Sequence, residues 1–372
     1  MRTDNRFRLA VMPGDGIGVE VMEAGLAVLD AVEERYGLSF DRIPVPGGAL
    51  YFKETGTPLD EAGFVEAERA DAVLFGAMGW PEVRYPDGTE IAPQLDLRVR
   101  LDLYAGVRPI RAIPGVRPTL ADPRAADIDL VILRESTEGM FVSRGKGEVT
   151  ETEARDTQVI TRRGTERLSR FAFELARRRK ADRGTRGEVT LVDKANVFRS
   201  FAFMRSLFDE VAREYPDVGA RHHYIDAMAL DLVRRPWDFD VLPTENLFGD
   251  IISDLGAGLI GGMGFAPSAD VGDEHALFQP SHGSAPDIAG RGIANPTAMI
   301  LSIGMMLDWL GDRHREEIYK TAASDLEAAV GQAFSSGAIR TFDIGGTATT
   351  AEVARAVIDT LHGAGAPGSA AR

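Results

Sequence analysis

Short apolar runs alternate along the chain with longer segments of helical periodicity. Apolar runs of strand length, which are typical of buried β-strands, occur at 7–12, 70–77, 128–133, 189–192 and 239–242. Apolar residues recur at helical spacing at 19–36, 165–179, 198–214, 227–235, 297–310, 316–335 and 351–362. Strands that alternate with helices predict an α/β fold. The chain shows no internal repeat, and the small, polar residues of 363–372 predict a loose tail.

Residues 138–161 break this alternation. The segment is polar, carries Gly145 and Gly147, and alternates in part between polar and apolar residues at 148–152. We predict a projecting β-hairpin arm. Because such an arm has little core of its own, it is expected to pair with another surface, such as that of a second subunit.

A glycine-rich turn follows the first predicted strand, at 13–18. A strand, a glycine-rich turn and a helix form the context of a Rossmann phosphate site. Here Gly14, Gly16 and Gly18 are evenly spaced, which is not the G-x-G-x-x-G pattern. Asp15 would also place a negative charge where a pyrophosphate binds. The turn therefore argues against a standard Rossmann site.

The composition is that of a soluble globular protein and removes several classes of function. The 372 residues are 44% hydrophobic and 27% charged. A net charge of −15 makes nucleic acid an improbable partner. Without cysteine there is no disulfide framework, zinc–thiolate site or cysteine nucleophile. No apolar run approaches the length of a membrane span, and no signal sequence is evident, so we expect a cytoplasmic protein with no membrane contact.

Two aspartates, Asp250 and Asp254, stand four residues apart between an apolar strand and a glycine-rich apolar segment. On a helix this spacing places both carboxylates on one face, where they repel each other. Two solvated surface acids are the simplest interpretation of such a pair. Because the flanking segments are apolar, a hard cation such as Mg²⁺ or Mn²⁺ bound by both carboxylates is the stronger hypothesis.

Three arginines, Arg98, Arg108 and Arg134, lie within or beside apolar segments. Arg134 ends a predicted buried strand, where an unpaired cation is costly. Guanidinium groups bind carboxylates with two parallel hydrogen bonds, so these residues are candidates for gripping an acidic substrate. The alternative is that each makes a structural ion pair, which is the interpretation we prefer for Arg100 and Arg111.

Polar residues also follow two further apolar runs. Lys194 lies at the end of the strand predicted at 189–192, and Asp226 ends a similar run at 222–226. Open α/β sheets bind ligands at the carboxyl ends of their strands. The adjacent His222 and His223 would point to opposite faces of a strand, so they are interpreted as structural and not as metal ligands.

A turn-rich loop at 282–287 contains His282 and Asp287, and Asn295 precedes Pro296 at a plausible helix start. Taken alone, these are weak signals. The order of these residues and the earlier motifs along the chain is a more specific signal than any one of them alone.

Together the motifs resemble the metal-dependent, decarboxylating 2-hydroxyacid dehydrogenases that act on 3-isopropylmalate, isocitrate, homoisocitrate, tartrate and D-malate. The resemblance runs nearly end to end and is carried by Val192-Asp-Lys-Ala-Asn-Val197, Asp226-Ala-Met228, Asn246-Leu-Phe-Gly-Asp-Ile-Ile-Ser-Asp254 and the segment 282–290. It implies a two-domain α/β fold that is not a Rossmann fold, with mixed sheets flanked by helices. A dinucleotide-binding domain would comprise 1–103 plus 259–372, and 104–258 would form a central substrate, metal and dimerisation domain. It further implies a homodimer that shares its active sites, clasped through the arm near 138–161.

The resemblance also implies a role for each candidate residue. The substrate would contact Arg98, Arg108, Arg134, Gln94, Leu95 and Val197. Asp226, Asp250 and Asp254 would bind Mg²⁺ or Mn²⁺, and the catalytic pair would be Lys194 and Asp226, both supplied by the partner subunit. The cofactor would contact Asn246, His282, Gly283, Ser284, Ala285, Asp287 and Asn295. A carboxylate at Asp287 suits the ribose hydroxyls and repels a 2′-phosphate, which favours NAD.

One departure from the family pattern bears on the chemistry. Phe141 stands where the family carries a tyrosine that donates a proton after decarboxylation, and a phenyl ring has no proton to give. Gln94 and Leu95 replace parts of the apolar pocket of isopropylmalate enzymes, and Gln279 replaces a usual glutamate. We expect NAD-dependent oxidation of a substituted malate such as 3-isopropylmalate, accompanied by decarboxylation. The alternatives are tartrate, D-malate or homoisocitrate oxidation, oxidation without decarboxylation, a lyase, and a silent regulatory subunit.

Overall fold

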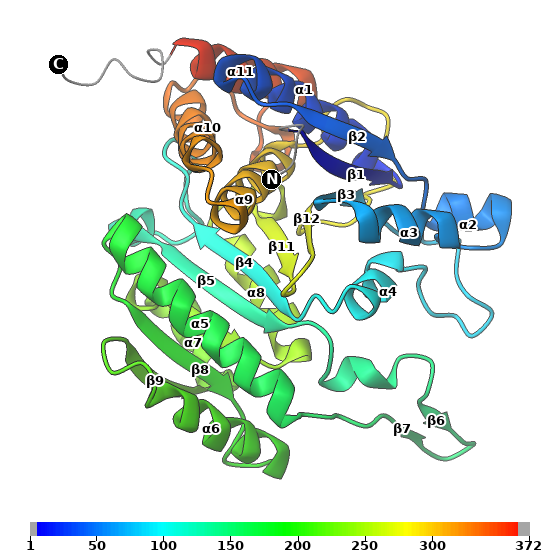
Figure 1. Ribbon diagram of the computed structural model, residues 1–372, viewed down its shortest axis with the longest axis vertical. Coiled ribbons are helices and arrows are strands. Elements are labelled where there is room, and N and C mark those ends of the chain that lie inside the picture. The colour runs from blue at the N-terminus through cyan, green and yellow to red at the C-terminus, as the bar shows by residue number, and fades with distance from the viewer. Residues whose placement is uncertain (1–5, 364–372) are drawn as a thin grey trace.

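A computed structural model describes residues 6–363 (Figure 1). The predicted tail at 363–372 lies, except for its first residue, outside the described residues. The helices are α1 (Ile17–Tyr36), α2 (Ala49–Thr55), α3 (Glu61–Arg69), α4 (Pro93–Arg100), α5 (Arg162–Arg183), α6 (Arg199–Ala212), α7 (Ile225–Arg234), α8 (Asn246–Leu259), α9 (Thr297–His314), α10 (Glu317–Ser335) and α11 (Thr350–Gly363).

One mixed sheet runs through the molecule. Its spatial order is β2 (Phe40–Pro44), β1 (Phe7–Gly14), β3 (Ala72–Ala77), β12 (Ala276–Pro280), β11 (Pro267–Val271), β4 (Ala105–Arg111), β5 (Asp129–Glu135), β10 (Val241–Thr244), β8 (Glu188–Asp193) and β9 (Gly219–Tyr224). The two ends of the sheet are parallel, whereas β11 is antiparallel to β12 and β4, and β4 is antiparallel to β5. Consequently β5, β10, β8 and β9 all end at the same edge of the sheet.

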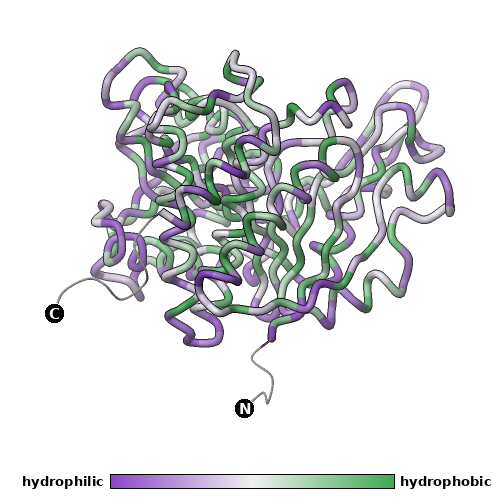
Figure 2. The backbone as a smooth tube through the Cα atoms, turned by 90° about the horizontal axis from the view of Figure 1, so that it is seen from above, coloured by the Kyte–Doolittle hydropathy of each residue, from purple (hydrophilic) through white to green (hydrophobic). Residues whose placement is uncertain are grey.

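Helices cover the sheet and close the core. α5 packs on β5, β8 and β10, and α8 packs on β4 and β5. At the other end of the sheet, α1, α9, α10 and α11 pack against one another (Figure 1). Figure 2 shows hydrophobic residues along the closely spaced inner segments and hydrophilic residues prevailing on the outer loops. No helix within 6–363 is both long and apolar enough to cross a membrane.

The predicted α/β pattern is confirmed. Every predicted strand lies in the large sheet, and every predicted helix is present with ends shifted by a few residues. The run predicted at 239–242 pairs only from Val241 onward, because a short 3₁₀ turn (Pro236–Asp238) precedes it. The pattern does not predict β2, β4, β11 and β12. β2 is a half-exposed edge strand, and in each of the other three a polar residue and a proline interrupt the apolar run.

The predicted arm is also confirmed as a hairpin. β6 (Glu148–Val149) pairs antiparallel with β7 (Ala154–Arg155), and both strands are exposed. The hairpin projects from the rest of the molecule on extended chain (Figure 1). The role of the arm in dimerisation remains a prediction. The division into two domains also remains a prediction, and it would separate the adjacent strands β11 and β4.

The glycine-rich turn after β1 has a structural role. Asp15 is buried and accepts hydrogen bonds from the backbone N–H groups of Ala49, Leu50 and Gly79 at 2.7, 2.9 and 2.9 Å. Its carboxylate therefore caps α2 and occupies the turn itself. This agrees with the prediction that no Rossmann phosphate site forms here.

Candidate active site

The site begins with a row of three residues across the central strands. Asp270 on β11, Gly106 on β4 and Arg134 on β5 are aligned in register. Side chains directly opposite one another lie on one face of a sheet. A Cβ atom at Gly106 would lie only 2.6 Å from the hydroxyl oxygen of Ser136. The glycine thus leaves room for the Ser136 hydroxyl and for the Cβ of Arg134, which would lie 3.2 Å away.

Two of the predicted arginines converge on Asp270. The Arg98 guanidinium reaches from α4 to within 3.0 Å of one carboxylate oxygen, and Arg108 on β4 lies 3.6 Å from the other. Arg108 also donates to Ser268. Burial, together with the positive charge of Arg98, leaves the pKa of Arg108 below its ordinary value, although Asp270 acts in the opposite direction. Arg98 and Arg108 therefore do make ion pairs within the chain, as the alternative interpretation holds, but both pair with the same acid, Asp270.

Arg134 joins this cluster to α8. Its Nε donates to the side-chain oxygen of Asn246 at 2.8 Å, and its guanidinium pairs with Asp250. The Phe141 ring lies 4.8 Å from the guanidinium carbon. A Cβ atom at Gly249 would lie 2.7 Å from the Arg134 Cβ, so this glycine lets α8 approach β5 closely enough for the pairing.

The predicted acid pair lies on α8. Glu245 caps the helix by accepting from the N–H groups of Leu247 and Phe248 at 3.0 and 3.3 Å. Asp250 and Asp254 therefore stand one turn apart on one helix face. Partial burial, followed by the negative charge of Asp250, raises the pKa of Asp254, while Arg108 and Arg134 act in the opposite direction. The pair thus carries a negative charge that a cation would stabilise.

Lys194 and Asp226 lie at the same edge of the sheet, after β8 and β9. Their side chains form an ion pair with each other, and Lys194 holds the pKa of Asp226 below its usual value. Within 6–363 no group of three or more acidic or histidine side chains is arranged to hold a metal ion. One chain therefore does not bring Asp226 together with Asp250 and Asp254.

The loop at 282–287 packs against the glycine-rich turn. The Ser284 carbonyl accepts from the Ile17 N–H at 2.8 Å, and the Ser284 hydroxyl donates to the Gly79 carbonyl. His282 places Nδ1 2.9 Å from the Gly283 carbonyl, and burial lowers its pKa. The His282 Nε2 is buried and has no hydrogen-bond partner within the described part of the chain.

The remaining cofactor candidates differ in accessibility. Asp287 and Gly283 are exposed, and Ala285 is half-buried with a φ of 37°. Asn295 is buried, accepts from the Thr297 N–H at 3.0 Å and donates to Asp343 at 3.0 Å, and it lies directly before Pro296, the N-cap residue of α9.

Asn246 is also engaged within the chain. It is fully buried, and its amide nitrogen donates to the Glu138 carbonyl at 2.8 Å. Because its oxygen accepts from Arg134, both polar atoms of the amide are engaged within the chain. The structure instead gives Asn246 a role in positioning Arg134, and its predicted contact with the cofactor stays a prediction.

The outer substrate candidates frame the arginines. Gln94 lies one turn before Arg98 on α4, and its side-chain oxygen is buried without a partner among the described residues. Leu95 is half-buried beside it, and Val197 is 59% exposed in the turn after β8.

His222 and His223, interpreted as structural, pair with Asp209 and Asp231 at 2.7 and 2.9 Å. Arg100 and Arg111 are paired with surface acids, as expected.

Asp270 is the polar residue that the sequence analysis did not identify. It lies inside a short strand between Ala269 and Val271. A lone charge within an apolar run is the signal that singles out Arg134, and Asp270 carries a weaker signal of the same kind. The strand is too short and too close to Pro267 for its pattern to stand out.

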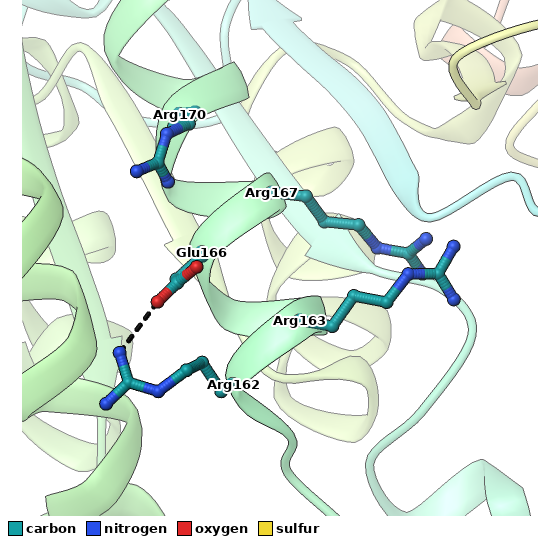
Figure 3. Close-up of a pocket in the computed structure, with 5 residues that line it drawn as sticks. All are labelled: Arg162, Arg163, Glu166, Arg167 and Arg170. Atoms are coloured by element: carbon teal, nitrogen blue, oxygen red, sulfur yellow. Dashed lines mark hydrogen bonds and ion pairs between the residues drawn. The ribbon is translucent and has the colours of Figure 1, made fainter.

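A separate hollow on α5 is not a candidate site. It is lined by Arg162, Arg163, Glu166, Arg167 and Arg170 (Figure 3). Arg162 pairs with Glu166 and Glu210, Arg163 and Arg167 with Asp102, and Arg170 with Glu214. Since each arginine has an acidic partner, the hollow holds no unmatched positive charge for an anion.

Known proteins are similar to this chain in sequence. A sequence model described as isocitrate/isopropylmalate dehydrogenase matches residues 8–357. A 3-isopropylmalate/3-methylmalate dehydrogenase of Methanocaldococcus jannaschii is 43% identical over 94% of this chain and 97% of its own length. A 3-isopropylmalate dehydrogenase of Vibrio parahaemolyticus is 40% identical over 90% of this chain and 92% of its own length.

Solved structures agree in fold. An isocitrate dehydrogenase from Methylococcus capsulatus superposes with a TM-score of 0.85 at 35% identity, over 95% of this chain and 99% of the other. A β-decarboxylating dehydrogenase from Thermococcus kodakarensis superposes with a TM-score of 0.78 at 41% identity, over 96% of each chain. These matches confirm the predicted isopropylmalate-dehydrogenase-like fold and exclude a Rossmann arrangement.

Proposed function

The chain belongs to the isocitrate/isopropylmalate dehydrogenase family, and on that premise we propose that it oxidises a substituted malate, such as 3-isopropylmalate, with NAD and a divalent metal. Loss of the β-carboxylate would accompany the oxidation. The observation that carries this proposal is the contact of Arg134 with Asp250, because it sets a carboxylate-binding cluster directly beside a pair of acids. A hydroxy acid needs both: cations for its carboxylates and a metal at its hydroxyl.

The residues present fit a divalent metal. Asp250 and Asp254 supply hard oxygen donors from one helix face, which suits Mg²⁺ or Mn²⁺. The raised pKa of Asp254 reflects burial and a neighbouring negative charge that a cation would relieve. We propose that Asp226 of a second copy completes this set.

The loop at 282–287 fits a dinucleotide. Its buried, unpartnered His282 Nε2 is available to a ligand, and the exposed Asp287 offers a carboxylate to ribose hydroxyls. A 2′-phosphate would be repelled by that carboxylate. These features support NAD over NADP.

The protein's own groups would then bind the substrate and move its proton. Arg98, Arg108 and Arg134 would hold the substrate carboxylates. The partner's Lys194 would take the proton from the C2 hydroxyl, directly or through a water molecule. When bound, the metal polarises the oxygen at C2 and NAD accepts the hydride.

Exposed apolar side chains support a dimer with shared sites. Leu230 and Val233 on α7 are 57% and 46% exposed, and Ile251 on the adjoining α8 is 61% exposed. Side chains of this kind favour burial against a partner. Ile251 follows Asp250 directly, so a second copy bound here would lie next to the metal-binding pair. The homodimer is therefore part of the proposal.

A second candidate is oxidation of a malate with a hydrogen-bonding substituent, such as tartrate. The buried, unpartnered oxygen of Gln94 favours it, because burying an unsatisfied acceptor is costly and a substrate hydroxyl would satisfy it. Homoisocitrate also carries a hydrogen-bonding substituent, whereas D-malate has no substituent and stays a separate alternative.

The proposal is tested by offering 3-isopropylmalate, tartrate, D-malate, homoisocitrate and isocitrate with NAD and Mn²⁺ while following NADH and CO₂. NADH formed in step with CO₂ from one of these acids is the expected result. NADH without CO₂ would remove decarboxylation, and absence of NADH with all of them would contradict the proposed function.

Phe141→Tyr is expected to raise the rate of CO₂ release, on the order of tenfold, if protonation of the decarboxylated product limits turnover. The phenyl ring lies 4.8 Å from Arg134, so a hydroxyl on it would stand at the substrate cluster. The measurement is CO₂ release and NADH formation in parallel. Phe203→Tyr, on the exposed face of α6, is the control. An unchanged rate of CO₂ release would mean that another proton donor already suffices.

A further inference from the structure

Asp270 is enclosed by polar contacts at the centre of the sheet. Its side chain is 0% exposed. One oxygen lies 3.0 Å from the Arg98 guanidinium and accepts from the Gln279 amide at 2.9 Å. The other lies 3.6 Å from Arg108 and accepts from the Ser136 hydroxyl at 3.3 Å. These partners come from four different elements of the chain, so the carboxylate ties them together.

The carboxylate is held in its charged form. Burial alone would raise the pKa of Asp270, but Arg98, Arg108 and Arg134 outweigh burial and leave the pKa below its ordinary value. The carboxylate therefore offers negative charge to both arginines throughout the neutral range.

The orientation of both guanidinium groups depends on this carboxylate. The Nε atoms of Arg98 and Arg108 are buried and have no hydrogen-bond partner among the described residues. Arg98 has no other acidic partner within 4.0 Å in the described part of the chain. Without Asp270, electrostatic repulsion between the two cations would push them apart.

We propose that Asp270 is a positioning residue that fixes Arg98 and Arg108 in the orientation that receives the substrate carboxylates. Gln279, one strand away on β12, orients Asp270 in turn through its amide. This inference rests on the proposed function, since it assigns the arginines to a carboxylate-bearing substrate. Asp270 would thus be a buried acidic residue of the site that contacts the arginines and does not bind the metal.

Asp270→Asn is expected to raise KM for the hydroxy acid about tenfold or more, because displaced guanidinium groups make weaker charged hydrogen bonds to the substrate carboxylates. KM for NAD should stay unchanged, and kcat should change far less than KM. The double variant Asp270→Asn/Gln279→Glu returns a carboxylate to the same cluster from the neighbouring strand. It should restore most of the affinity for the hydroxy acid. A purely structural role would change stability without this split between KM and kcat.

Asp240→Asn is the matched control. Asp240 is also buried and pairs with an arginine, Arg179 at 2.8 Å, but that pair lies under α5 and away from the arginine cluster. Asp240→Asn should lower the melting temperature and leave KM unaltered. If Asp270→Asn does not fold, Gln279→Met keeps the carboxylate but removes its orienting donor, and a smaller rise in KM is expected.

Direct binding separates failure of this inference from failure of the proposed function. Calorimetry of tartrate and D-malate, with Mn²⁺ but without NAD, measures affinity independently of turnover. Weaker binding by Asp270→Asn than by Asp240→Asn supports the inference. Equal affinities and equal KM values for the wild type and both Asp270 and Gln279 variants would overturn it, even if the wild type forms NADH. Wild-type binding without NADH from any of the five hydroxy acids would instead overturn the proposed function, and the affinity comparison would still decide the role of Asp270.

Discussion

Asp250→Asn is expected to lower metal-dependent turnover by about 100-fold or more, because a Lewis-acidic metal contributes several kcal/mol to the transition state and this substitution removes one of its ligands. Asp250 stands one turn before Asp254 on α8 and contacts Arg134. An amide at this position keeps the shape of the side chain but loses its charge. The measurement is initial rate against Mn²⁺ concentration, together with direct calorimetry of Mn²⁺ binding.

The control for this substitution is Asp30→Asn. Asp30 is an exposed acid on α1 that pairs with Arg42 at 2.6 Å, and ion pairs at the surface contribute little. Its loss should leave both rate and Mn²⁺ affinity within about twofold of the wild type, consistent with that small contribution. If Asp250→Asn behaves like Asp30→Asn, the acid pair on α8 does not bind the metal.

Lys194→Met is expected to lower kcat by about 100- to 10,000-fold, which is the usual contribution of a positioned acid–base group. Lys194 follows β8 at the edge of the sheet and pairs with Asp226. Methionine keeps the length of the side chain but cannot carry a proton. Single-turnover measurement of NADH formation isolates the chemical step from product release. Substrate affinity should change much less than kcat.

Lys320→Met provides the matched control for the lysine. Lys320 lies on α10 and also pairs with an aspartate, Asp312 at 3.0 Å, away from the candidate residues. The loss of this pair should not alter NADH formation. Near-normal turnover in Lys194→Met would assign the proton transfer to another group and remove Lys194 from the catalytic pair.

The sequence predicts those parts of the fold and site that depend on local periodicity. The spacing of Asp250 and Asp254 indicates a shared helix face, and α8 provides it. Arg134 was identified because a charge at the end of an apolar run is costly to bury, and its side chain is 4% exposed on β5. In both cases a few neighbouring residues contain the whole signal.

The parts that depend on distant contacts could not be predicted in this way. Asp270 acquires its role only when β11 pairs with β4, and the two strands are far apart in the sequence. Asn246 binds Arg134 because Gly249 allows α8 to approach β5 closely. No local pattern encodes either arrangement.

The most direct test of the account mixes two inactive variants. If Lys194 and Asp250 act in one site from different subunits, a dimer of Lys194→Met with Asp250→Asn contains one site with both substitutions and one site with neither. After the two variants are unfolded and refolded together in equal amounts, about one quarter of the wild-type activity should return, since half of the dimers would be mixed and each would hold one intact site. Activity that remains at the level of the separate variants, with mixed dimers shown to be present, would contradict the shared site.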